Sequence, residues 1–196
     1  SNINFGNVIL ANLQNLKVKK FINFTTVWEN YNGQKDKSFN LYSTSKQLFR
    51  KILNFSKKQN NKIKFYNFFI SDTYGKNDKR NKLINVLNKN YKKNKLTKIV
   101  SKNLYINLLN ISDILRAVNL VINKNIKPGN YSLSNFSDFK ISTIISKINI
   151  KKKKIKVKWL SSKIIKEKIY KYNKIPNWRP QLSNFDNLIK FITDRS

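Results

Sequence analysis

The sequence of 196 residues predicts an α/β fold with a mainly parallel sheet. Segments with the helical spacing of apolar residues alternate along the chain with short segments of the kind that form strands. Residues 63–70 are largely apolar without alternation, as expected for a strand that is buried on both faces. Apolar residues make up 40% of the chain, which is enough to build a sizeable core.

In the first half of the chain, the spacing of apolar residues separates three helices from three strands. The helix that begins at Leu41 carries Leu48, Phe49 and Ile52 on one face. Tyr74-Gly75 marks the turn that precedes the third helix. The expected helices cover residues 8–16, 41–55 and 78–91, and the expected strands cover residues 18–24, 63–70 and 96–100.

In the second half, capping and turn residues mark where the elements begin. Ser112 and Asp113 are typical of a helix start. Pro128-Gly129-Asn130 predicts a turn before a short strand. The expected helices cover residues 112–123, 141–148, 162–172 and 184–193, and the expected strands cover residues 104–108, 131–133 and 155–159.

The composition excludes several kinds of site. The chain has no Cys and no His, which excludes disulfides, thiolate chemistry and histidine-based catalysis or metal binding. Nine Asp and Glu residues are scattered along it, so we expect no metal. No apolar run approaches about 18 residues, and the first residues lack a signal-peptide pattern. We therefore expect a cytoplasmic protein without a membrane span.

The net charge of +32 suggests a nucleic-acid partner, but the composition favours another cause. The cations are 36 Lys and only 5 Arg, and Asn is abundant whereas Ala, Gly and Pro are scarce. Codons rich in A and T encode the favoured residues, so base composition alone can load the surface with lysine. The one dense run is residues 151–154. We rank nucleic-acid binding second and expect nucleic acid not to be the partner.

Two short motifs could carry chemistry. The strand over 18–24 runs into Thr25 and Thr26, and hydroxyls at the carboxyl end of a parallel strand lie where α/β sheets bind ligands. Tyr42 and Lys46 are four residues apart at the start of a helix and therefore share one face. A nearby ammonium group lowers the pKa of a phenol, which would make Tyr42 a usable general acid or base. Alone, the threonines could simply end a strand.

With these motifs in place, the sequence resembles the extended short-chain dehydrogenase/reductases that act on nucleotide sugars. Residues 12–26 are similar to the helix and strand that end in the catalytic Ser/Thr of that family, and residues 40–53 carry its YxxxK helix. Four later pieces follow in the family's order, at residues 69–87, 104–117, 129–135 and 177–191. The subgroup that the stretches around Trp28 and Tyr74 resemble is the CDP-abequose and CDP-paratose type, which makes sugars of bacterial lipopolysaccharide O-antigen.

The resemblance implies the carboxyl-terminal portion of a Rossmann-like, doubly wound parallel sheet together with a small α/β substrate-binding region. Residues 1–75 would form the rear half of the Rossmann-like domain. Residues 76–196 would form mostly the nucleotide-sugar region, with residues 104–123 returning to the Rossmann-like core. It also implies NAD or NADP as cofactor, a nucleotide sugar as substrate, and a homodimer through the YxxxK helix and its neighbour.

The resemblance also implies a role for each matching residue. Thr26 would hydrogen-bond the substrate oxygen, Tyr42 would pass the proton, and Lys46 would hold the ribose of the cofactor. Ser71 would face the nicotinamide, while Asp72 and Lys82 would bind the substrate. The expected activity is hydride transfer at a sugar keto or hydroxyl carbon, as a reductase or an epimerase.

The chain departs from the family pattern in ways that keep two alternatives open. It holds only four Gly residues and no GxxGxxG phosphate loop, and Lys76 stands where the family has Pro after Tyr-Gly. The alternatives are a basic nucleic-acid-binding module and an inactive fragment of the same enzyme family.

Overall fold

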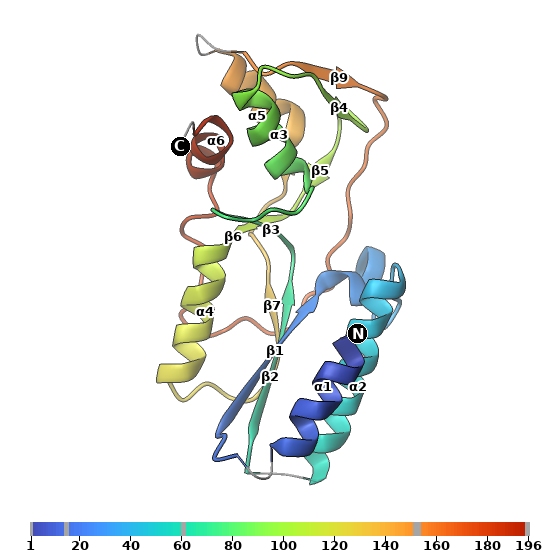
Figure 1. Ribbon diagram of the computed structural model, residues 1–196, viewed down its shortest axis with the longest axis vertical. Helices are drawn as coiled ribbons and strands as arrows, with labels where there is room; N and C mark the ends of the chain where they lie inside the picture. The colour runs from blue at the N-terminus through green and yellow to red at the C-terminus, as the bar shows by residue number, and fades with distance from the viewer. Residues whose placement is uncertain (1, 14–15, 60–61, 151–153, 195–196) are drawn as a thin grey trace. The chain divides into compact units, whose positions relative to one another are not determined.

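The computed structural model describes residues 2–13, 16–59, 62–150 and 154–194 of the chain (Figure 1). The chain divides into two compact units. Unit 1 comprises Ser1–Ser71, Arg116–Leu133 and Lys168–Trp178, and unit 2 comprises Asp72–Leu115, Ser134–Glu167 and Arg179–Ser196. The chain therefore passes from one unit to the other several times.

Unit 1 is built on a parallel sheet with the strand order β1-β2-β7. These strands are β1 (Lys20–Thr26), β2 (Lys64–Ile70) and β7 (Gly129–Leu133). The central strand β2 is buried from Phe65 to Phe69, which explains its apolar sequence without alternation. The predicted α/β class with parallel pairing is confirmed.

A ladder of hydrogen-bonded side-chain amides, two of them buried and the third partly buried, crosses this sheet. Asn23, Asn67 and Asn130 lie opposite one another in the strand register. The Nδ2 atom of Asn23 donates to Oδ1 of Asn67 over 2.9 Å, and Nδ2 of Asn67 donates to Oδ1 of Asn130 over 2.8 Å. We define these three residues as the asparagine ladder. Because buried amides need partners, the ladder favours one register among all that the apolar neighbours would tolerate.

Helices α1 (Asn2–Asn12) and α2 (Leu41–Gln59) pack side by side against this sheet (Figure 1). Leu13, Phe49 and Leu53 are buried together with Phe65 of β2 and form the core between helices and strands. The short helix η1 (Val27–Gly33) continues directly from β1. The helix α4 (Ile111–Asn123) belongs to unit 1 from Arg116 onward, where Ala117 and Val121 are fully buried.

In its described residues, unit 2 contains three two-stranded pairs and three helices that surround one apolar core. β3 (Asp72–Tyr74) pairs with β6 (Leu108–Asn110) and β4 (Thr97–Ile99) with β9 (Val157–Trp159), both in parallel, whereas β5 (Tyr105–Ile106) and β8 (Phe139–Lys140) are antiparallel. The helices are α3 (Leu83–Lys92), α5 (Ile141–Asn149) and α6 (Phe185–Thr193). Leu87, Ile144 and Leu188 contribute one fully buried side chain from each helix.

Asp113 has a different role from the expected helix cap. The helix begins at Ile111, and the amide of Ser112 donates to Oδ1 of Asn110 over 2.9 Å. The buried carboxylate of Asp113 accepts hydrogen bonds from the backbone amides of residues 181–183 and from the Ser183 hydroxyl at 2.6 Å. It therefore anchors the segment that leads into α6.

Three sequence predictions of helices need correction. Residues 162–172 form no helix, because their backbone bonds to neighbouring strands instead: Ile165 pairs in parallel with Leu104, and the Tyr172 amide donates to Ser132 Oγ over 2.8 Å. The helix expected over 78–91 begins at Leu83, since Asp78 holds the preceding residues in a loop by accepting from the Arg80 amide over 3.1 Å. The helix expected over 8–16 occupies Asn2–Asn12 instead, and Leu13 and Leu16 lie in turns; residues 14–15 lie outside the described residues.

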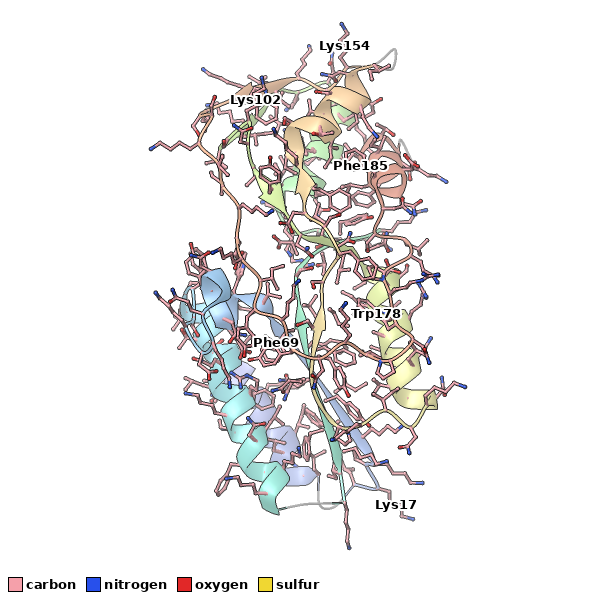
Figure 2. The ribbon with its side chains drawn as sticks, turned by 180° about the vertical axis from the view of Figure 1, so that it is seen from behind. Lys17, Phe69, Lys102, Lys154, Trp178 and Phe185 are labelled. Carbon is pink, nitrogen blue, oxygen red and sulfur yellow. The ribbon has the colours of Figure 1, made fainter. Side chains whose placement is uncertain are left out.

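Lysines occur in both units. Lys17, Lys102 and Lys154 are exposed and extend away from the chain (Figure 2). Lys154 is the only member of the run 151–154 within the described part of the chain.

The asparagine ladder yields the first prediction. In Asn67→Val, the Asn23 amide and the Asn130 carbonyl oxygen lose their partners, and each loss costs about 1–3 kcal/mol. We expect the free energy of unfolding in urea to fall by about 2–4 kcal/mol. The triple variant Asn23→Val/Asn67→Val/Asn130→Val leaves no orphaned amide and should recover part of this loss. A triple variant less stable than Asn67→Val would contradict the role of the ladder.

Candidate functional site

Thr26 and Ser71 lie at the same edge of the unit 1 sheet. Thr26 is the last residue of β1 and lies opposite Ile70, and Ser71 follows directly after Ile70. The Ser71 amide donates to the carbonyl of Leu133, the last residue of β7, over 3.1 Å. The carboxyl ends of all three parallel strands therefore meet here, where open α/β sheets bind their ligands.

Helix α2 presents Tyr42 and Lys46 from its first two turns. Its start is fixed by a reciprocal cap, in which the Ser43 amide donates to Asn40 Oδ1 and the Asn40 amide donates to Ser43 Oγ, each over 3.0 Å. The Lys46 ammonium group donates to the Phe24 carbonyl oxygen over 3.1 Å, so Lys46 reaches the carboxyl end of β1. Tyr42 lies one turn earlier on the helix and is 51% exposed.

A buried carboxylate that the motifs did not single out joins β1 to α2. Glu29 is 0% exposed, accepts from the Thr25 hydroxyl, and accepts from Nε of Arg50 over 2.6 Å. The same guanidinium group contacts Asp36 Oδ1 over 2.6 Å. Thr25 adjoins Thr26, and Arg50 lies one turn beyond Lys46. Glu29 therefore ties together the two elements that carry the predicted catalytic residues.

The burial of this cluster changes its acid–base behaviour. Removal from water raises the pKa of Glu29 to about 7, although the hydrogen bond and the charge of Arg50 oppose the rise. Burial likewise lowers the pKa of Lys46, and the nearby Glu29 opposes this shift. A lysine with a lowered pKa beside the end of β1 is typical of a functional site.

Two buried polar atoms of unit 1 have no hydrogen-bond partner within the described residues. They are the hydroxyl oxygen of Ser71 and Nδ2 of Asn30. Ser71 lies at the carboxyl edge of the sheet, and Asn30 lies in η1 close after Thr26. Buried polar groups are nearly always paired, so an orphaned hydroxyl at this edge fits a site that accepts a polar ligand.

The two predicted substrate-binding residues lie in unit 2 and contact each other. Lys82 Nζ is 3.2 Å from Asp72 Oδ1, and both side chains are partly exposed. The structure thus brings Thr26, Lys46 and Ser71 to one edge of unit 1, with Tyr42 one turn from Lys46, and pairs Asp72 with Lys82 in unit 2.

Glu29 and Arg50 were not singled out from the sequence. The available signal was an acid three residues after Thr26 and an arginine one helical turn after Lys46. Charged residues at such spacings are common in this chain, so only the structure distinguishes this buried pair.

The remaining observations concern metals and membranes. Among the described residues, no three acidic side chains gather into a group that could hold a metal ion. None of the described helices combines the length and the apolar character that crossing a membrane requires.

The Glu29 cluster yields the second prediction, which concerns pH. Because the folded pKa of about 7 exceeds the ordinary value of 4.5, the folded state holds this proton more tightly than the unfolded state. The stability contributed by the proton is fully present below pH 4.5 and is lost as the pH rises through about 7. The unfolding free energy of the wild type, relative to Glu29→Gln, should therefore fall by up to about 1.4 kcal/mol per pH unit across this range.

Arg50, Asp36 and Lys46 are the charged groups that face Glu29, and they are retained in this variant. Asp186→Asn, a substitution at an exposed residue of α6, serves as the control and should leave the profile parallel to that of the wild type. Parallel profiles for Glu29→Gln and the wild type would refute the shifted pKa.

No profile of a known protein family matches the chain, and no curated protein matches it. Solved structures do. UDP-glucose 4-epimerase from Thermotoga maritima, solved with UDP-glucose, matches at a TM-score of 0.80 and 15% identity over 99% of this chain and 68% of its own. dTDP-glucose 4,6-dehydratase from Bacillus anthracis, solved with NAD, matches at a TM-score of 0.79 and 16% identity over 97% of this chain and 66% of its own.

A third match is a Tyr-to-Phe mutant of UDP-glucuronic acid 4-epimerase from Bacillus cereus, at a TM-score of 0.78 and 17% identity over 99% of this chain. It was solved with NAD and a fluorinated UDP-sugar, and the chain covers 66% of its length. The chain spans about two thirds of the length of these enzymes. At this level of identity the comparison establishes the fold alone: the chain shares the fold of these two epimerases and this dehydratase over the part that it spans.

Proposed function

We propose that the protein is an NAD(P)-dependent nucleotide-sugar epimerase or reductase. The observation that carries the proposal is the contact of Lys46 with the carboxyl end of β1, two residues before Thr26, with Tyr42 one turn away on the same helix. The fold is one that nucleotide-sugar epimerases and dehydratases share. The proposal thus rests on a site within unit 1 and on a scaffold of matching type.

The cofactor proposed is NAD or NADP. The dehydratase structure contains NAD, and a matching structure from Pseudomonas aeruginosa contains NADPH. In this chain Lys46, Tyr42 and Ser71 would hold the cofactor, and the orphaned Ser71 hydroxyl supports this because it needs a polar partner. When bound, the nicotinamide supplies or takes up the hydride.

Residues of the chain would transfer the proton to and from the sugar oxygen. The Tyr42 phenol would donate a proton to the sugar oxygen during reduction and accept it during oxidation. The Thr26 hydroxyl would hydrogen-bond the same oxygen and fix its position. The ammonium group of Lys46 would favour the phenolate form of Tyr42 by its charge, and the carbonyl of Phe24 holds that ammonium group in place.

The division of labour along the chain is also part of the proposal. Residues 1–75 would supply the catalytic half, and residues 76–196 would supply most of the nucleotide-sugar region, with residues 104–123 returning to the first. Asp72 and Lys82 would contact the substrate after their ion pair opens. The pathway proposed is the synthesis of bacterial surface polysaccharide sugars in the cytoplasm.

The third prediction tests Tyr42. The protein, in the full form that its gene encodes, is assayed with NAD or NADP and a panel of UDP-, dTDP- and CDP-sugars by NAD(P)H absorbance and product analysis. We expect Tyr42→Phe to lower kcat by roughly 10²–10⁴-fold, the usual contribution of a positioned general acid or base. Because Tyr42 is half exposed, the free energy of unfolding of Tyr42→Phe should stay within about 0.5 kcal/mol of the wild-type value.

Tyr105→Phe in unit 2 removes a hydroxyl elsewhere and serves as the matched control. Equal activity of Tyr42→Phe and Tyr105→Phe would overturn the assignment of Tyr42. A wild-type protein that is folded but inactive on the whole panel would overturn the proposed function.

We further propose a homodimer that buries the outer face of α2. Leu41, Leu48 and Phe55 recur at seven-residue spacing on this helix and are 85%, 44% and 62% exposed. A heptad spacing places them in one stripe along the helix. On the neighbouring helix α1, Phe5 and Val8 are also largely exposed. An apolar stripe of this kind is typical of a helix that packs against another copy.

The fourth prediction concerns this dimer. The wild-type protein should have the mass of a dimer in light scattering after size-exclusion chromatography. Leu48→Lys/Phe55→Lys should shift it to a monomer at the same concentration, because two charges would be buried in the interface. Leu160→Lys, at an exposed position of unit 2, is the control. A monomeric wild type would contradict the proposal.

A further inference from the structure

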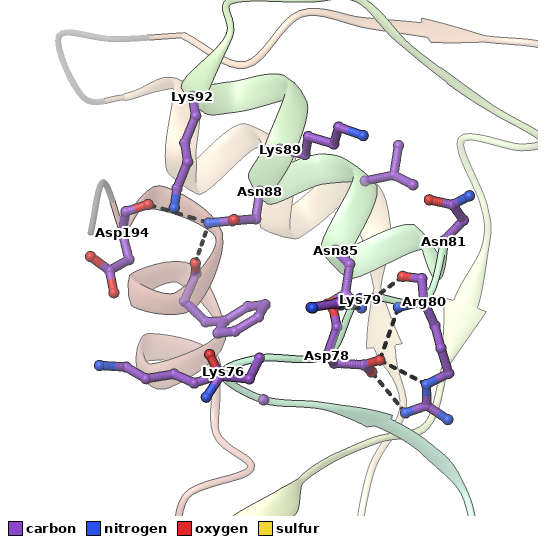
Figure 3. Close-up of a pocket in the computed structure, with 14 residues that line it drawn as sticks. Lys76, Asp78, Lys79, Arg80, Asn81, Asn85, Asn88, Lys89, Lys92 and Asp194 are labelled. Carbon is purple, nitrogen blue, oxygen red and sulfur yellow. Dashed lines mark hydrogen bonds and ion pairs between the residues drawn. The ribbon is translucent and has the colours of Figure 1, made fainter.

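Unit 2 contains a pocket of about 530 Å³ whose lining residues include none of the proposed site residues. It lies among the loop over residues 75–81, the outer turns of α3, and the end of α6 (Figure 3). Asp72 and Lys82 do not line it, and Thr26, Tyr42 and Lys46 belong to unit 1. It is therefore a separate cavity that needs its own explanation.

Cationic side chains are enriched in the lining of this pocket. Five of the fourteen lining residues are Lys or Arg, compared with 41 of 196 in the whole chain. The acidic ones are Asp78 and Asp194.

Arg80 forms an ion pair with Asp78. Its Nε and Nη2 atoms each lie 2.7 Å from the Asp78 carboxylate, and this contact is the largest cause that lowers the pKa of Asp78. Arg80 and Asp78 therefore balance each other's charge, and the excess positive charge comes from the lysines.

Three of these lysines have no hydrogen bond or ion pair to any of the described residues. They are Lys76 and Lys79 on the loop and Lys89 on α3. Their ammonium groups are exposed and share one cavity, so they repel one another in the absence of an anion. An anion with several charges would remove this repulsion.

Two asparagines hold the walls of the pocket in place. The Asn85 amide donates to the carbonyl oxygens of Asp78 over 3.1 Å and Arg80 over 3.0 Å, which fixes the loop to α3. The Asn88 amide donates to the carbonyl oxygens of Phe191, Ile192 and Asp194 over 2.8, 3.1 and 3.3 Å, which fixes the end of α6 to the same helix. The lysines thus extend from walls whose backbone is already positioned, as binding requires.

We propose that this pocket binds a compact anion that carries several phosphate groups and has the size of a nucleoside triphosphate. The volume lies within the range of about 300–1,000 Å³ that is typical of small-molecule sites. Lysine ammonium groups bind phosphate as point charges. Val86 and Phe191 add an apolar part to the wall, against which a base could lie.

A competing explanation is that a chain of net charge +32 attracts every anion without a site. The two explanations differ in which lysines anion binding depends on. A site depends on Lys76, Lys79 and Lys89, whereas diffuse attraction responds equally to the loss of any three lysines.

The fifth prediction tests this difference by isothermal titration calorimetry at physiological ionic strength. ATP and inorganic tripolyphosphate, both without a metal ion, are titrated into the wild-type chain. We expect binding of both, and Lys76→Gln/Lys79→Gln/Lys89→Gln should weaken it at least tenfold. The control is Lys17→Gln/Lys57→Gln/Lys102→Gln, which removes the same charge from exposed positions elsewhere. It should stay within threefold of the wild type.

Each outcome decides the proposal. If ATP binds more tightly than tripolyphosphate, the base contacts the apolar wall. If the two bind equally, only the phosphates are recognised. Both results support the site. Equal weakening by the two triple variants, or no binding by the folded wild type, overturns it. A single-stranded oligonucleotide that binds through these lysines more tightly than ATP would also overturn it, in favour of a nucleic-acid surface.

Discussion

The register of the β1-β2-β7 sheet is the constraint on which the rest of unit 1 depends. The asparagine ladder secures it, because a slip of one residue between neighbouring strands would break the hydrogen bonds that pair these amides. The register also sets which residues end the strands together. Thr26 and Ser71 reach one edge only because Thr26 lies opposite Ile70. The candidate site is therefore a consequence of amide pairing deep in the sheet.

Four of the nine acidic residues of this basic chain lie where they organise structure. Glu29 and Asp36 share Arg50, Asp78 holds Arg80, and Asp113 fixes the segment before α6. Each of these carboxylates joins elements or closes a loop, and Glu29 alone is both fully buried and bound to β1 and α2. The surface carries the excess of lysine, while these four acids make specific contacts.

Local pattern was sufficient to predict much of the fold. The parallel strands over 18–24, 63–70 and 131–133 and most helices follow from apolar spacing, which acts within a few residues. Local pattern failed for the segment over 162–172. The apolar spacing of this segment is helical, but distant residues such as Leu104 and Ser132 pair with its backbone. The shared helical face of Tyr42 and Lys46 could be predicted from their spacing within one helix. The link from Arg50 to Glu29 joins residues 21 positions apart, and the side-chain geometry that creates it is not encoded in any local pattern.

The asparagine ladder also bears on how this sequence has evolved. Asparagine has codons rich in A and T, so a genome of that composition scatters it across tolerant surfaces. At positions 23, 67 and 130 the same amino acid is held by its partners on adjacent strands, and no single one can change without stranding another. At these positions, mutational bias and structural need favour the same amino acid. A protein under such mutational pressure can keep its sheet aligned with the residue that the pressure itself supplies.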